Sequence, residues 1–463
     1  MRTTFIYGGT LVDPSQNCCK KAALLCTDGK VTEIIEENDT EQILRRKAGA
    51  DRIIDASGCV VCPGFVDIHM HEDPYDSRTD TLDKSIARSM VLMGVTSALG
   101  GNCGGNCGQP KTYLDAVDRI GTATNIALLA GHTFLRKLCG GTDKYAPISD
   151  SILHRMVESA QEALQAGCFG ISFGVKYIPG TQWKEIIALA SLCRKDDRLV
   201  ASHVRNDVDG VFSACDELAR IGQEAGVKVQ FSHIGSMGGY GQMKHLLAQI
   251  EDYRGCGINM MCDCYPYDAF STGIGETTYD DGFLESYQSD YSHIQLCDGP
   301  YAGQRCTKEL FEELRANAPE TMTIGYFMRA DDVEMALRSP FVMVGSDGLR
   351  NGDQGHPRAA GTFPRVLSHY VRRGKLRLNE AIAKMTCIPA QRMGLLHKGS
   401  LKPGFDADIV IFDPETVEDK ATFESPALAP TGIHYVLIGG EIAAEHGQLL
   451  RDDLGRSLRF GIN

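Results

Sequence analysis

The chain has 463 residues and a formal net charge of −13 at pH 7, and 43% of its residues are hydrophobic. This length suits two or three domains, or one large α/β barrel with a smaller attached domain. The acidic balance argues against nucleic acid and against an anionic membrane surface as partners, because both require a basic protein face. A small molecule is therefore the expected partner.

The sequence predicts a cytoplasmic protein. It contains no run of about 20 apolar residues, and its start, residues 1–9, lacks the apolar core of a signal peptide. The 17 cysteines of this long chain indicate reduced thiols rather than a disulfide framework.

Three segments follow one another along the chain. Residues 1–62 contain short strand patterns separated by Gly turns, which predicts a small β-rich unit. Residues 63–395 alternate helical patterns with apolar runs, and so many units in one block predict a (β/α)8 barrel with a parallel sheet. Residues 396–463 return to β patterns, and we expect them to pair with residues 1–62 in a β-sandwich. The alternative is two separate small domains.

The first candidate site follows a short apolar run at residues 60–68. Pro63 and Gly64 interrupt the run, which predicts a buried strand entered through a tight turn. His69 and His71 come at its end and project to the same side of an extended strand, so both imidazoles can reach one metal ion. The alternative is a pair of core histidines without a ligand. Imidazole combined with carboxylate or thiolate favours zinc or a similar first-row ion.

Further ligand types come at the ends of later apolar runs, where the functional site of a barrel lies. They are Cys103 after residues 95–99, His203 after 199–202, His233 after 227–232 and Asp347 after 341–346. Cys107 repeats the local Gly-Asn-Cys-Gly pattern, so spacing alone leaves both thiols as candidates. A carboxylate at the end of a late strand can contact a metal and still accept a proton, which suits Asp347.

Two other histidines are candidates for the site. His132 ends an apolar run and precedes Arg136, and both a structural role and a substrate-orienting role are open for it. His356 lies with Arg358 in a Gly-His-Pro-Arg stretch that we expect to form a loop over the site.

A set of motifs spread over nearly the whole chain completes the pattern. They are 63–71, 101–104, 131–132 with Arg136, 177–180, 263–267, 346–347, 356–365 and 398–412. Together they resemble the amidohydrolase superfamily and, within it, the N-acyl-D-amino acid deacylases, or D-aminoacylases. The resemblance implies a distorted (β/α)8 barrel with a small β-sandwich and zinc at the barrel mouth.

The resemblance also implies roles for individual residues. Cys103, His203 and His233 match the ligands of a tight zinc site, and Cys103 takes the place of a carboxylated lysine in related hydrolases. His69, His71 and Asp347 match a second, weaker metal position. Tyr265 or Tyr267 is expected to bind the α-carboxylate of the substrate, and His132, His356 and Arg358 are the other expected substrate contacts.

Two positions depart from the family pattern. The family commonly has a Lys shortly after the second strand-end histidine, whereas His233 is followed by Ile-Gly-Ser-Met. It also commonly has an acidic residue where this chain has Lys176. A carboxylated Lys176 that bridges two metals is an alternative to Cys103 as a ligand. The family's arginine after Tyr267 has no clear counterpart, since the next one is Arg305.

The implied reaction is zinc-dependent hydrolysis of N-acyl-D-amino acids to a carboxylate and a free D-amino acid. Zinc would supply hydroxide at neutral pH, and Asp347 would act as general base and then as general acid. Residues 276–298, rich in Asp and Tyr, are the expected lid, whose acidic charge would disfavour acidic substrates.

Two alternatives to this function remain. One is a cyclic amide hydrolase resembling dihydroorotases or hydantoinases, and the other is a non-catalytic scaffold that kept the barrel. The sequence leaves open the acyl group, the amino-acid side chain, the number of working metals and whether the chain forms a homo-oligomer.

Overall fold

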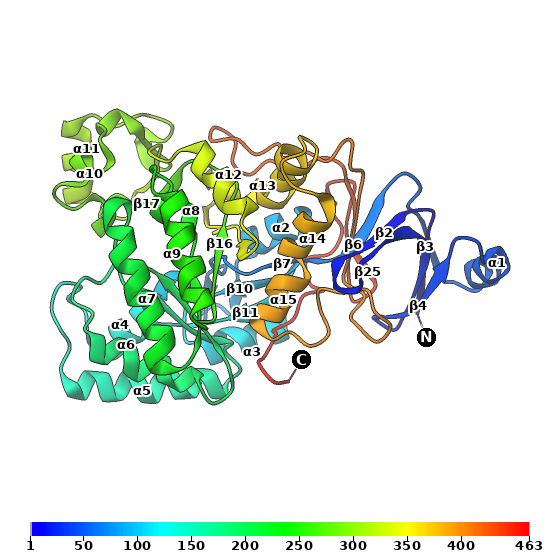
Figure 1. Cartoon of the computed structure of the whole chain (residues 1–463), viewed down its shortest axis with the longest axis horizontal. Helices are drawn as coiled ribbons and strands as arrows, with labels where there is room; N and C mark the ends of the chain where they lie inside the picture. Colours follow the sequence, from blue (N-terminus) through cyan, green and yellow to red (C-terminus); the bar gives the residue numbers. More distant parts are fainter. Residues whose placement is uncertain (1, 463) are drawn as a thin grey trace.

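The two ends of the chain meet in one mixed sheet, at the right of Figure 1. In the computed structural model, which describes residues 2–462, β23 (Ile409–Phe412) pairs antiparallel with β6 (Val60–Pro63). The other strands of this sheet are β1 (Thr3–Tyr7), β2 (Thr10–Asp13), β3 (Cys18–Thr27), β4 (Lys30–Glu36), β5 (Arg52–Asp55), β24 (Ile433–Ile438), β25 (Glu441–Glu445) and β26 (Gln448–Leu449). The predicted pairing of the two chain ends is confirmed.

The middle of the chain forms a barrel of parallel strands. Its strands are β7 (Phe65–Asp67), β10 (Val95–Gly100), β11 (Asn125–Leu128), β12 (Ala130–Gly131), β13 (Gly170–Gly174), β14 (Leu199–His203), β15 (Lys228–Phe231), β16 (Met260–Cys264) and β20 (Val342–Val344). Only Leu129 separates β11 from β12. Every residue of β13 and of β14 is buried, as parallel strands covered on both faces require.

The barrel closes between its first and last strands. A parallel bridge joins Met70 to Gly348, and Asp347 donates its backbone N–H to the carbonyl of His69 at 2.7 Å. The chain end also returns to the barrel, where Phe460 packs against Phe169 with ring centroids 5.6 Å apart.

Helices surround the barrel (Figure 1). They are α2 (Ser85–Leu92), α3 (Pro110–Ile120), α4 (His132–Leu138), α5 (Asp150–Gln165), α6 (Trp183–Ala190), α7 (Val211–Ala225), α8 (Ile234–Gly238), α9 (Met243–Gly255), α12 (Ala330–Arg338), α13 (Arg358–Arg365), α14 (Leu378–Met385) and α15 (Cys387–Met393), while α1 (Thr40–Ala48) lies on the terminal sheet. In α7 the buried residues Val211, Ala214, Cys215 and Leu218 recur at helical spacing, and Gly226 ends the helix in the left-handed conformation.

An additional segment, residues 270–325, stands beside the barrel mouth at the upper left of Figure 1. It contains the antiparallel strands β17 (Phe270–Gly273), β18 (Ile294–Leu296) and β19 (Met322–Gly325), with the helices α10 (Phe283–Tyr287) and α11 (Lys308–Asn317). Two short hairpins, β8 (Tyr75–Asp76) with β9 (Thr81–Leu82) and β21 (Arg350–Asn351) with β22 (Gln354–Gly355), complete the strands of the described residues.

Two expectations about the chain as a whole can be compared with residues 2–462. All 17 cysteines are free thiols, as predicted. Over the same residues, no helix combines the length and the apolar character that crossing a bilayer requires. The domain boundaries at 62/63 and 395/396 stay predictions.

Candidate metal centre and active site

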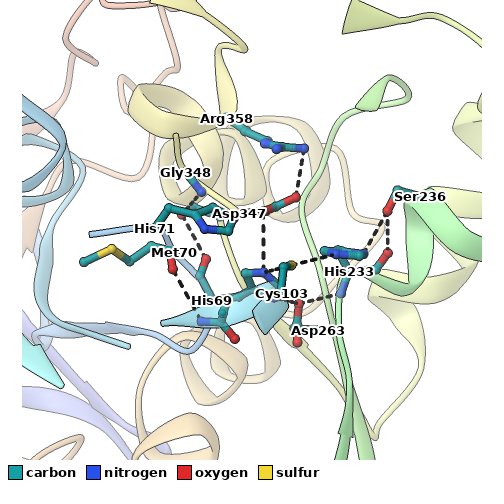
Figure 2. Close-up of polar contacts among 12 residues, drawn as sticks. His69, Met70, His71, Cys103, His233, Ser236, Asp263, Asp347, Gly348 and Arg358 are labelled. Atoms are coloured by element: carbon teal, nitrogen blue, oxygen red, sulfur yellow. Dashed lines mark hydrogen bonds and ion pairs between the residues drawn. The ribbon is translucent and has the colours of Figure 1, made fainter. Parts of the chain in front are cut away.

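The six predicted ligands lie together at the carboxyl ends of the barrel strands. Their ligand atoms form two groups, and within each group the atoms lie within 4.8 Å of one another. The first group is His69, His71, Cys103 and Asp347, and the second is Cys103, His203 and His233. Figure 2 shows Cys103 between His69 and His233, so one thiol is shared by both groups.

Short distances between the ligand atoms show that the side chains of each group converge. Cys103 Sγ lies 3.4 Å from His69 Nε2 and 3.3 Å from His233 Nε2. Asp347 Oδ1 lies 3.0 Å from His71 Nε2 and 3.4 Å from His69 Nε2. These side chains come from positions 69 to 347, and parallel strand ends bring them together.

His203 provides the sharpest evidence that these residues bind a cation. Its side chain is buried, and neither ring nitrogen forms a hydrogen bond of good geometry, although one lies within 4.8 Å of the Cys103 thiol. The ring packs between Tyr177 and His233, with centroids 4.4 and 4.5 Å away. Leaving a buried polar group without a partner costs about 1–3 kcal/mol. A cation within reach of His203, His233 and the Cys103 thiolate would remove that cost, and this donor set is one that zinc prefers.

The electrostatics of the cluster favour deprotonated Cys103, His203 and Asp347, whereas nearby anions raise the pKa of His69 well above its usual value and that of His71 to about 9, so a metal would displace protons from these two imidazoles. Burial alone would raise the pKa of the Cys103 thiol, but the charges of His233 and His69 lower that pKa well below its usual range. Burial lowers the pKa of His203 to about 4, so its imidazole is neutral at pH 7. Arg358 and His71 outweigh the effect of burial on Asp347, so the pKa of this carboxyl is far below its ordinary value.

Three of the six ligands have a left-handed backbone, which residues other than glycine rarely adopt. The φ angles are 52° at Cys103, 35° at His233 and 50° at Asp347. Such conformations cost about 1–3 kcal/mol each and concentrate at functional sites. Gly174 permits the turn at Cys103, because a Cβ at Gly174 would lie 2.2 Å from the Cys103 carbonyl oxygen.

Two buried carboxylates position the ligands. Asp263 Oδ1 lies 2.9 Å from His69 Nδ1 and accepts the backbone N–H of His233 at 2.7 Å (Figure 2). Glu72 accepts the backbone N–H groups of Gly101 at 2.6 Å and Cys107 at 3.0 Å, which fixes the turn that carries Cys103. Sequence reasoning assigned neither residue a role, although Glu72 follows the His69–His71 pair and Asp263 begins one of the family-like motifs.

Two cavities meet at the cluster. The inner, smaller one is lined by Tyr265 and by residues of the insertion, and the outer, larger one by Glu276 and Glu320. Asp347 and Arg358 line both, and Arg358 Nη1 lies 2.9 Å from Asp347 Oδ2. An elongated substrate whose reacting bond lies at the cluster would thus extend into both cavities.

The predicted substrate contacts divide into two sets. Tyr265 and Arg358 line the inner cavity. His132, Tyr267 and His356 line neither cavity and lie behind the wall. His132 Nε2 is 2.7 Å from Glu185 Oε1 in the core, Tyr267 packs against the Arg365 guanidinium, and His356 Nδ1 accepts the backbone N–H of Arg358. His356 thus contacts Arg358 rather than the cavity.

The alternative ligands make other contacts. Cys107 Sγ donates to the carbonyl of Glu72, and burial raises the pKa of this thiol far above its usual value. Lys176 Nζ lies 2.9 Å from Asp207 Oδ1 in an ion pair. Geometry therefore favours Cys103 over both.

The segment expected to form a lid contributes to both cavities. Glu276 lines the outer cavity, while Thr278 and Tyr287 line the inner one. Its acidic charge is partly matched, since Asp280 forms an ion pair with Arg315 at 2.5 Å.

A parallel (β/α)8 barrel with such a ligand cluster at its strand ends is the architecture of a metal-dependent hydrolase. Residues 52–136 and 310–444 match the sequence model of the amidohydrolase family. A D-aminoacylase of Alcaligenes xylosoxydans xylosoxydans is 33% identical over 476 aligned residues, which cover 94% of this chain and 93% of the relative.

Solved structures agree with the sequence match. A D-aminoacylase, studied for its binuclear metal centre, superimposes with a TM-score of 0.87 at 28% identity over 98% of this chain and 99% of its own. The N-acyl-D-glutamate deacylase of Bordetella bronchiseptica, in complex with zinc and a phosphonate inhibitor, gives 0.85 at 31% identity over the same shares. The chain belongs to the amidohydrolase family and is related to the D-aminoacylases. The predicted family and fold class are confirmed.

Proposed function

We propose that this protein is a zinc-dependent deacylase that hydrolyses N-acyl-D-amino acids to a carboxylate and a free D-amino acid. The observation that carries the proposal is the pair of ligand groups that share Cys103 at the junction of two cavities. Relatives named for this kind of activity include a D-aminoacylase and an N-acyl-D-glutamate deacylase, and both match nearly the whole chain.

The metal and the protein would divide the chemistry. Zinc, when bound by Cys103, His203 and His233, supplies Lewis acidity and a water of lowered pKa. His69, His71 and Asp347 would provide a second, weaker position. Asp347 is ionised because Arg358 lies against its other oxygen, so it can accept a proton from the attacking water and return it to the departing amine.

The substrate carboxylate needs a cation and a hydroxyl, since a buried carboxylate without partners is costly. Arg358 and Tyr265 offer both within the inner cavity, where the Arg358 guanidinium lies 4.7 Å from the centre of the Tyr265 ring. The outer cavity contains Glu276 and Glu320, which would repel a carboxylate. We therefore assign the amino-acid half to the inner cavity and the acyl half to the outer one.

The two alternatives have less support. A cyclic amide hydrolase of the expected type needs Lys176 as a carboxylated ligand, whereas Lys176 forms an ion pair with Asp207. A scaffold without activity has no physical need for six convergent ligands and a buried imidazole at His203 that forms no hydrogen bond of good geometry.

A panel of N-acetyl and N-formyl D- and L-amino acids, incubated with the zinc-loaded protein and assayed for free amine, tests the proposal. We expect release from D-substrates and at least a hundredfold slower release from the D347N variant, as loss of a general base commonly gives. Release from L-substrates alone, or from a cyclic amide alone, would refute it.

A further inference from the structure

A largely buried ion pair forms part of the wall of the inner cavity. Lys176 Nζ lies 2.9 Å from Asp207 Oδ1, and the two side chains are only 12% and 13% exposed. Both residues line the cavity. Neither belongs to a ligand group, so the proposed chemistry leaves the pair without a role.

Neighbouring elements fix the position of the pair. Lys176 follows β13 and Asp207 follows β14, which are adjacent parallel strands of the barrel. Tyr287 of α10 donates its hydroxyl to Asp207 Oδ2 at 2.6 Å, and Thr277 donates its hydroxyl to the Lys176 carbonyl at 2.7 Å. Burial and the Asp207 charge keep the pKa of Tyr287 well above its usual value, so the phenol remains a donor.

The Lys, Arg and Asp side chains that line the inner cavity form two ion pairs without net charge. The Lys176 ammonium faces the Asp207 carboxylate, and the Arg358 guanidinium faces the Asp347 carboxylate at 2.9 Å. Apart from the ligand histidines, the remaining lining residues of the described chain are uncharged: Tyr177, Ser236, Met237, Tyr265, Phe270, Ser271, Thr272, Thr278 and Tyr287. The carboxylate of a bound amino acid has Arg358 and Tyr265 as partners, which leaves Lys176 and Asp207 to meet the side chain.

We propose that Lys176 and Asp207 determine specificity by restricting the amino-acid side chain to uncharged groups, an inference that rests on the proposed function. A charged side chain would compete for one member of the pair and leave the other, largely buried, without its counter-charge, a penalty that can exceed what the new contact gains. An uncharged side chain leaves the pair intact. The pair thus disfavours both signs of charge, whereas a lone lysine would select acidic side chains.

Three substrates of similar length test this inference: N-acetyl-D-glutamine, N-acetyl-D-glutamate and N-acetyl-D-lysine. For the zinc-loaded wild type we expect kcat/KM for the glutamine substrate to exceed both others by at least about tenfold. Asp207→Asn leaves the Lys176 charge unmatched and should raise the glutamate-to-glutamine ratio about tenfold or more. Lys176→Met leaves Asp207 unmatched and should raise the lysine-to-glutamine ratio to a similar extent.

Two kinds of variant separate this role from misfolding. The double variant K176M/D207N has no net charge in the wall, so the preference for glutamine should return. The matched controls are K184M and D150N, because Lys184 and Asp150 form an ion pair of the same residue types at 2.7 Å that is exposed and lies outside both cavities. Both controls should keep wild-type ratios.

Calorimetric binding of free D-glutamine, D-glutamate and D-lysine to the same zinc-loaded proteins supplies a readout without turnover. We expect the order of affinities to change in D207N and K176M as the kinetic ratios do. If the wild type hydrolyses none of the three substrates but the binding order changes as expected, the proposed function fails, while the selection against charged side chains by Lys176 and Asp207 is supported. Binding orders that stay the same in D207N and K176M, or no binding of any of the three, would overturn it.

Discussion

Replacing Asp263 by Asn should weaken zinc binding while leaving the fold intact. Asp263 is 1% exposed and contacts His69 Nδ1 at 2.9 Å, the backbone N–H of His233 at 2.7 Å and Gln230 Nε2 at 2.8 Å. A carboxylate behind a ligating imidazole orients the ring and raises its basicity, and losing it commonly weakens metal affinity about 10–100-fold. This corresponds to about 1.4–2.8 kcal/mol of binding free energy.

Asn is the appropriate replacement for Asp263 because neighbouring residues can hydrogen-bond to its side-chain amide. Gln230 Oε1 is buried without a partner, so a half-turn of the Gln230 amide lets it accept the N–H of the new side chain. Asp263→Ala would instead leave the donors of His69, His233 and Gln230 unpaired, at about 1–3 kcal/mol each. The D263N variant therefore separates metal affinity from stability.

The assay is the zinc dissociation constant, measured by competition with a chelator, together with the thermal midpoint of the metal-free protein. Asp332→Asn serves as the control, since Asp332 is buried at the start of α12, outside both cavities. We expect weaker zinc binding in D263N only. Wild-type affinity in D263N would refute the idea that Asp263 supports the ligand set.

Three further predictions follow from individual contacts. Cys103→Ala should lose bound zinc while Cys107→Ala retains it, as elemental analysis would show. Arg358→Met removes the partner that keeps the pKa of Asp347 low, so the acidic limb of the kcat/KM profile should move to higher pH. Burial lowers the pKa of Lys384 to about 8 from 10.5, so the folded chain binds fewer protons than the unfolded chain between these values. The free energy of unfolding of the wild type, relative to that of Lys384→Met, should therefore rise by up to about 3 kcal/mol as the pH increases from about 8 to 10.5. Denaturant titrations at several pH values measure this difference.

Each of these has an outcome that contradicts it. Zinc lost equally from both cysteine variants would remove the distinction between the two thiols. An acidic limb that stays in place in the arginine variant would show that Asp347 does not titrate in the profile. A stability difference between wild type and K384M that is independent of pH would show that burial does not penalise the charged lysine.

The ligands at the strand ends could be predicted because short stretches of sequence are sufficient to locate each strand and the residue that ends it. Apolar runs identify parallel strands, and the carboxyl ends of parallel strands meet at one face of a barrel. This is why His203, His233 and Asp347 could be grouped although long stretches of chain separate them. The pairing of residues 60–63 with 409–412 was likewise predictable from β patterns at both chain ends.

Other features depend on long-range packing that no local pattern contains. Cys103 and Cys107 have the same sequence neighbours, and their difference arises from the left-handed φ of Cys103 and from the contact of Cys107 with Glu72. The motif with His356 and Arg358 marked the right segment, but only the fold shows that His356 faces the backbone and Arg358 the cavity.

The central claim is that a thiolate from the turn at residues 102–104 and imidazoles from separate strands bind the same ion. X-ray absorption at the zinc edge of the purified, zinc-loaded protein tests it most directly. We predict a zinc–sulfur distance of about 2.3 Å in the wild type that disappears in the C103A variant. A wild-type spectrum that contains only nitrogen and oxygen ligands at about 2.0–2.2 Å would contradict the claim.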